Sequence, residues 1–174
     1  MRLLLLLALL APGPPAHAAD PKPARPAAQA APGPKSIGTF EDWQAATHQE
    51  AGALVCYAFT RATPADPAAP NRGDAVLTVT HRTGGRDTVA VSANAAYPAG
   101  ATVRVGVDQT QLPFYTAARS AFARDGKAAV AAFEKGRTAT VRSTGGRAAS
   151  APDTFSLRGF TAAYAAINKA CPPR

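Results

Sequence analysis

Two cysteines, Cys56 and Cys171, carry the most specific chemistry that this sequence offers. Cys56 lies in an apolar run, and Cys171 stands far along the chain, after an Ala-rich segment. In an oxidising compartment two such residues pair, and closing so long a loop contributes about 4 to 5 kcal/mol at most. Two free thiols or a redox-active pair is the alternative, although no C-x-x-C spacing supports it. We therefore predict a disulfide between Cys56 and Cys171.

Other catalytic chemistry is hard to assemble from the remaining residues. After residue 18 the chain has two histidines, His48 and His81, and His81 is expected on the surface beside Arg82 at the end of a strand. The sequence contains no G-x-S-x-G elbow, no H-E-x-x-H motif and no Cys/His cluster. Glu41 and Asp42 are expected in one strand, where adjacent side chains face opposite ways and form no acid/base pair. We predict no catalytic, cofactor-binding or metal-ligating residues and no enzyme activity.

Aromatic side chains offer a second kind of chemistry, because exposed rings stack on sugars and cations. A glycan-binding groove is therefore one interpretation of the aromatic set, and core packing is the favoured one. The set consists of Trp43, Tyr57, Phe59, Tyr97, Phe114, Tyr115, Phe122, Phe133, Phe155, Phe160 and Tyr164.

Residues 1–18 predict export. Arg2 precedes the apolar run Leu3 to Leu10, prolines follow, and Ala16-His17-Ala18 fits the A-x-A pattern of a signal peptidase site. Cleavage is expected between Ala18 and Ala19. A permanent membrane anchor, the alternative, needs about 20 continuous apolar residues, which this run does not reach. We expect a periplasmic or secreted protein, with association to the outer surface as a variant, and no transmembrane segment after cleavage.

The mature chain is basic. The full sequence has 19 Lys and Arg against 11 Asp and Glu, and loss of Arg2 leaves a net charge of +7. A scattered positive surface favours weak, salt-sensitive attraction to anionic envelope polymers, while solubility and compositional bias are the alternative explanation. No basic cluster indicates a nucleic-acid partner. The dispersed arginines are Arg61, Arg72, Arg82, Arg86, Arg104, Arg119, Arg124, Arg137, Arg142, Arg147 and Arg158.

Composition divides the mature chain into a tether and a domain. Residues 19–36 are rich in Pro and Ala and lack aromatic and branched aliphatic residues, so we expect an extended, disordered tether. Residues 37–174 are long enough for one domain with its own core.

Hydrophobic alternation in residues 37–174 predicts an all-β fold. In the clearest example, Val103, Val105 and Val107 share one face, while Arg104 and Asp108 face the other way. Many short strands at this spacing predict an antiparallel β-sandwich, with a barrel-like arrangement as the alternative. The expected strands are 40–47, 53–59, 75–80, 88–91, 102–108, 111–115, 137–143 and 154–158, with turns at 83–85, 98–100 and 145–146.

Two segments interrupt the β pattern. Gly126 to Lys135 predicts a short internal helix that ends at Gly136. Thr161 to Ala170 predicts a C-terminal helix that stops before Pro172, with an apolar stripe on one side.

The order of several motifs resembles the invasion-associated locus B family. These motifs are Phe40-Glu41-Asp42-Trp43, Cys56-Tyr57-Ala58, Val79-Thr80-His81-Arg82, Val103 to Asp108, Lys135-Gly136-Arg137 and Asp153-Thr154-Phe155-Ser156-Leu157-Arg158-Gly159-Phe160, followed by Ala163 and Cys171. The most specific part is the D-T-F-S-L-x-G-F segment that leads into an Ala-rich helix and a terminal Cys. The resemblance implies an exported envelope protein of the type found in α-proteobacteria, where some members are associated with host-cell invasion and virulence. It provides no catalytic residues to carry over.

The cysteine pattern places the chain closest to a branch of that family with one disulfide. The commoner pattern has a cysteine shortly after the first-strand Trp, where this chain has Ala45, Ala46 and Thr47. It also has a further cysteine pair after the L-P-F/Y strand, where residues 115–125 contain no Cys.

We therefore expect an exported, non-enzymatic envelope protein that binds or stabilises an envelope or host-surface partner. The partner is expected to be an anionic envelope polymer or a host or envelope protein. An envelope hydrolase or redox enzyme is the alternative from another class, and a purely structural surface protein is a third interpretation.

Overall fold

Ten strands and two helices make up the described part of the chain, which in this computed structural model covers residues 33–64, 75–93, 95–144 and 152–173. These residues belong to one compact unit, residues 31–174. The strands are β1 (Lys35–Phe40), β2 (Trp43–Glu50), β3 (Ala53–Arg61), β4 (Val76–Arg82), β5 (Gly85–Ser92), β6 (Val103–Val107), β7 (Thr110–Ala117), β8 (Ser120–Ala123), β9 (Thr138–Ser143) and β10 (Asp153–Ser156). The helices are α1 (Gly126–Lys135) and α2 (Phe160–Ala170).

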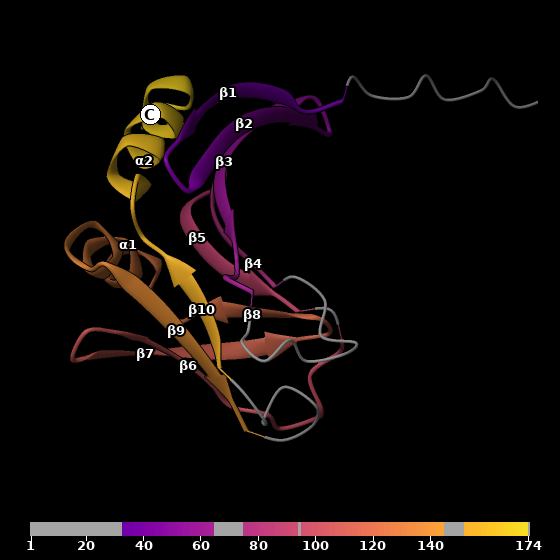
Figure 1. Cartoon of the computed structure of the whole chain (residues 1–174). Helices are drawn as coiled ribbons and strands as arrows, with labels where there is room; N and C mark the ends of the chain where they lie inside the picture. The colour runs from indigo at the N-terminus through magenta and orange to yellow at the C-terminus, as the bar shows by residue number, and fades with distance from the viewer. Residues whose placement is uncertain (1–32, 65–74, 94, 145–151, 174) are drawn as a thin grey trace, which may run out of the picture. The chain divides into compact units, whose positions relative to one another are not determined.

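The strands form one antiparallel sheet in the order β1-β2-β3-β4-β5-β8-β7-β6-β9-β10. The sheet bends so that β10 returns toward β2 and β3: the Trp43 indole N–H donates to the Ser156 carbonyl oxygen at 3.0 Å, and the Thr63 N–H donates to that of Thr154 at 2.7 Å. Figure 1 shows the strands β1–β5 and β6–β10 as the two halves of this bend. The all-β prediction with two helices is confirmed. The barrel-like alternative is wrong, because β1 and β10 are not paired and the sheet stays open.

The N-terminal boundary of the domain differs slightly from the predicted one. The signal peptide 1–18, its cleavage site and most of the tether 19–36 lie outside the described residues. Strand β1 begins at Lys35, within the predicted tether, and pairs Lys35 with Thr47 and Ser36 with Ala46. Backbone hydrogen bonds to β2 hold these residues, and such bonds require no apolar side chain.

Two strand predictions need correction. The expected strand 40–47 is two strands, β1 and β2, joined by a tight turn at Glu41 and Asp42. Glu41 has a φ of 49°, and Ala51, Asp108 and Ala118 in other hairpin turns also have positive φ. Tight hairpin turns with positive φ usually contain Asn-Gly or Asp-Gly, and these four turns contain neither pair. Strand β8 was not expected, because Ser-Ala-Phe-Ala has weak strand propensity.

The core lies on the inner face of the bent sheet, under both helices. Val103, Val105 and Val107 are each at most 2% exposed, which confirms the predicted alternation, and Arg104 is exposed. Helix α1 packs on β5, and α2 packs on β1, β2 and β3. The bounds of α1 match the prediction, and the Asp125 side chain caps it by accepting from the Ala128 N–H at 3.0 Å.

Two glycines permit close approaches that set where the helices start. Gly159 precedes α2 with a φ of 84°, and a Cβ there would collide with the Phe40 carbonyl oxygen. Gly126 starts α1, and a Cβ there would collide with the Asp87 carbonyl oxygen. Both helices are therefore held against strands by backbone contact.

Candidate functional site

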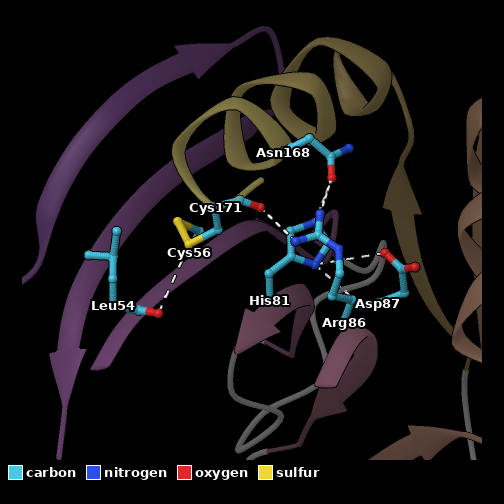
Figure 2. Close-up of a disulfide and its surroundings, with 7 residues drawn as sticks. All are labelled: Leu54, Cys56, His81, Arg86, Asp87, Asn168 and Cys171. Carbon is cyan, nitrogen blue, oxygen red and sulfur yellow. Dashed lines mark hydrogen bonds and ion pairs between the residues drawn. A yellow bond between two sulfur atoms is a disulfide. The ribbon is translucent and has the colours of Figure 1, made fainter. Parts of the chain in front are cut away.

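The disulfide joins the end of α2 to the middle of β3, between Cys56 and Cys171, as the sequence predicts. The two Cα atoms are 6.1 Å apart, and the bond closes a separation of 115 residues. Cys56 is fully buried and Cys171 is half-buried. Figure 2 shows this bond beside a group of polar side chains from β4, β5 and α2.

His81 is fully buried next to the disulfide, which corrects the expectation of a surface imidazole. Its Nδ1 accepts from the Asp87 N–H at 3.2 Å, so its Nε2 donates to Asn168 Oδ1 at 3.1 Å. Leu77, Val79 and His81 alternate along β4 and share its inner face. That alternation was the sequence signal for burial of the imidazole.

Arg86, Asp87 and Tyr164 complete the polar group. The Arg86 guanidinium donates to the Cys171 carbonyl oxygen at 2.6 Å and also to Asn168 Oδ1. The Tyr164 hydroxyl donates to Asp87 Oδ1 at 2.7 Å. Each of these bonds joins β5 to α2 or to the residue that follows it. Figure 2 shows Arg86 and Asp87 of β5 beside Asn168 and Cys171. We call the disulfide together with His81, Arg86, Asp87, Tyr164 and Asn168 the C-terminal latch.

The titratable groups of the latch are unsuited to acid/base catalysis. Burial, followed by the nearby Arg86 charge, lowers the pKa of His81. Burial and the hydrogen bond to Asp87 raise the pKa of Tyr164 to about 12. Both imidazole nitrogens have partners, and the ring has no exposed surface for a substrate. The latch therefore stabilises the packing of α2 and Cys171 against the sheet.

The remaining sequence candidates are separate from one another. Glu41 and Asp42 occupy a turn rather than a strand; Glu41 pairs with Arg158 at 2.9 Å, and Asp42 accepts from the Ser156 hydroxyl at 2.7 Å. Gly84 lies in the β4–β5 turn, whereas the 145–146 turn lies outside the described residues.

Within the described ranges, no three His, Cys, Asp or Glu side chains gather as a metal site. None of the described helices is long and apolar enough to cross a membrane.

A hollow of about 600 Å³ opens beside the disulfide, at the tips of the β2–β3 and β4–β5 hairpins. Leu54, which is 40% exposed, lines it together with Arg82, Arg86 and the prolines after α2. Arg82 pairs with Glu50 at 2.7 Å, and Arg86 is engaged in the latch. Both arginines of the lining are therefore occupied within the protein.

The aromatic set divides between core and surface. Trp43, Phe133, Phe155 and Phe160 are at most 1% exposed, as core packing predicts. Tyr115 on β7 is 46% exposed and stacks on Phe122 of β8, with 5.5 Å between ring centroids. The guanidinium of Arg124 lies 5.8 Å from the centre of the Tyr115 ring. An exposed ring with a cation over it remains on the outer face of the sheet.

Two further arginines lie on the same outer face. Arg104 of β6 stands directly opposite Arg142 of β9, and Pro113 of β7 pairs with Arg104 from the other side. Both arginines are exposed, and neither has a carboxylate partner among the described residues. The outer patch is defined as Arg104, Pro113, Tyr115, Phe122, Arg124 and Arg142.

Comparison with known families places the fold. Residues 43–168, which make up most of the chain, match the family described as Invasion associated locus B (IalB) protein. The chain belongs to this family. It is also similar to the crystal structure of invasion associated protein B from Bartonella henselae, with a TM-score of 0.56 and 17% identity over 76% of this chain and 95% of that chain. At that identity the likeness shows the fold alone. No curated protein matched the chain.

The strongest IalB motif in this chain has a structural explanation. In the segment from Asp153 to Phe160, Phe155, Leu157 and Phe160 are buried in the core, and Gly159 supplies the left-handed residue before α2. The segment builds the corner that carries α2 to the latch. The motif is therefore evidence of a fold shared with the family and not of shared chemistry.

Proposed function

We propose that the mature chain is an exported, non-enzymatic protein of the cell envelope that binds an anionic partner there. Membership of the IalB family, whose members are envelope-associated, supports the location. The predicted signal peptide and the net charge of +7 after cleavage support export and an anionic partner.

One observation carries the proposal: His81 and Tyr164, whose pKa values are shifted, are held inside the latch, whereas Arg104 and Arg142, which have no carboxylate partner among the described residues, are exposed. His81 and Tyr164 have their partners on neighbouring elements and little access to a substrate. Arg104 and Arg142 lie side by side on the exposed face. This distribution favours binding over catalysis, because an enzyme needs its reactive groups accessible to the substrate.

Export and envelope binding are tested on the full-length protein expressed in a Gram-negative host. Mass spectrometry of the processed protein should show Ala19 as the first residue, and a retained Leu-rich segment would contradict export through this signal. The purified mature protein should sediment with isolated envelopes at about 0.05 M salt and be released near 0.5 M, because screening shortens charge interactions to a few ångströms. A protein that never sediments with envelopes, or whose sedimentation ignores salt, would overturn the proposal.

A further inference from the structure

The outer patch spans four adjacent strands in the order β8, β7, β6 and β9. Tyr115 pairs with Phe122, Pro113 pairs with Arg104, and Arg104 pairs with Arg142. Cross-strand partners point to the same face, so these side chains form one continuous surface. With neighbouring strands about 4.8 Å apart, the surface is about 14 Å across, which is larger than a site for one small anion. The four strands lie in the half of the sheet below α1 in Figure 1.

The two facing arginines create an electrostatic cost that no carboxylate in the described part of the chain relieves through an ion pair. Like charges directly opposite each other on neighbouring strands are destabilising. The positions beside them on this face are Pro113, Gly106 and Thr140, none of which is charged. An anionic group held between Arg104 and Arg142 would turn this repulsion into two charge-assisted contacts. The pair is therefore arranged for an external anion.

The aromatic half of the patch favours a ligand with flat, weakly polar faces. Tyr115 is exposed at the end of a stack that Phe122 supports from the next strand. Arg124 holds its position through its own N–H, which donates to the Pro113 carbonyl oxygen at 3.1 Å, and its guanidinium lies over the Tyr115 ring. Sugar rings stack on such a surface, whereas a purely charged polymer gains nothing from it. The combination distinguishes an acidic sugar from a polyanion without rings.

We propose that the outer patch binds an acidic polysaccharide, with its carboxylates at Arg104 and Arg142 and a sugar face against Tyr115. The inference rests on the proposed envelope-binding function and names the ligand class and the surface that takes it.

The test is a titration of the mature protein with polygalacturonate, a polymer of an acidic sugar, with dextran and polyglutamate as the neutral and ring-free comparisons. The unaltered protein should bind polygalacturonate more tightly than polyglutamate and should not bind dextran. Arg104→Gln/Arg142→Gln should weaken polygalacturonate binding by about tenfold or more. Lys127→Gln/Lys135→Gln removes the same charge from exposed positions on α1 and should leave the affinity within about twofold.

Tyr115 separates a sugar site from a merely cationic surface. Tyr115→Ser should weaken polygalacturonate binding by about threefold to tenfold and leave polyglutamate binding unchanged, while Tyr115→Phe should retain the stacking and the affinity. Equal loss in the arginine and lysine double variants, or no effect of Tyr115→Ser on polygalacturonate, would overturn the proposal. Sedimentation with envelopes that is untouched by the patch variants would overturn this inference alone and leave the proposed function standing.

Discussion

The latch and the outer patch use similar side chains for opposite purposes. In the latch, Arg86 is surrounded by acceptors, and the buried His81 ring has a partner at each nitrogen. In the outer patch, Arg104 and Arg142 face each other in solvent with no described carboxylate beside them. The comparison shows that residue type alone does not mark a functional site in this protein. Burial and partners decide whether a cation stabilises the fold or is available to a ligand.

Removal of the disulfide should give the largest effect on stability. Cys56→Ser/Cys171→Ser should lower the free energy of unfolding by about 2 to 5 kcal/mol, because the bond closes a long loop and fastens α2. Urea unfolding followed by circular dichroism measures the loss. The Arg104→Gln/Arg142→Gln variant should unfold at nearly the native midpoint. An unchanged midpoint in the cysteine variant would show that the latch does not depend on its covalent bond.

Tyr164→Phe should destabilise the protein by about 1 to 3 kcal/mol, since it removes a hydrogen bond to a carboxylate. The ring and its stacking on Phe160 remain, so the change isolates the hydroxyl. The matched change on the outer patch, Tyr115→Phe, should alter stability by no more than about 0.5 kcal/mol. Equal urea midpoints for the two variants would contradict the claim that the tyrosine hydroxyl stabilises the fold in the latch but not in the outer patch.

The latch should also make stability depend on pH through His81. Its pKa in the folded protein is lowered, so the unfolded chain takes up a proton first as the pH falls through about 6.5. Stability is therefore fully present above that pH and declines as the solution becomes more acidic. His81→Gln should flatten this decline between about pH 7 and pH 5, measured as urea midpoints at each pH. A slope identical to that of the unaltered protein would assign the acid sensitivity to other groups.

Arg104→Gln should have the smallest effect and the opposite sign. Relief of the like-charge pair should stabilise the protein by about 0.2 to 0.5 kcal/mol at low salt and by less at high salt. Thermal unfolding at two salt concentrations measures the difference. A clear destabilisation would mean that the arginine pair supports the fold.

The sequence predicted the parts of the fold that local patterns control. Alternation in Val103 to Val107 identified a strand and its buried face, and the Ala-rich segment identified α1 with its bounds. The Glu41–Asp42 turn was missed, because its positive φ lies on a residue that carries no turn signature.

Neither polar region could be assembled from the sequence, because both depend on distant contacts. His81 meets Asn168 across 87 residues, and only the placement of α2 brings them together. Arg104 meets Arg142 because β6 pairs with β9, past two intervening strands and a helix. The disulfide was predictable, because a sequence with two cysteines allows one intramolecular pairing.

Arginine-selective labelling with phenylglyoxal, read by mass spectrometry with and without polygalacturonate, tests most directly the difference between the closed latch and the proposed binding face. The polymer should slow labelling of Arg104, Arg124 and Arg142 and leave labelling of Arg82 and Arg158 unchanged. Uniform slowing at all exposed arginines, or protection confined to Arg82 beside the disulfide, would contradict the proposal.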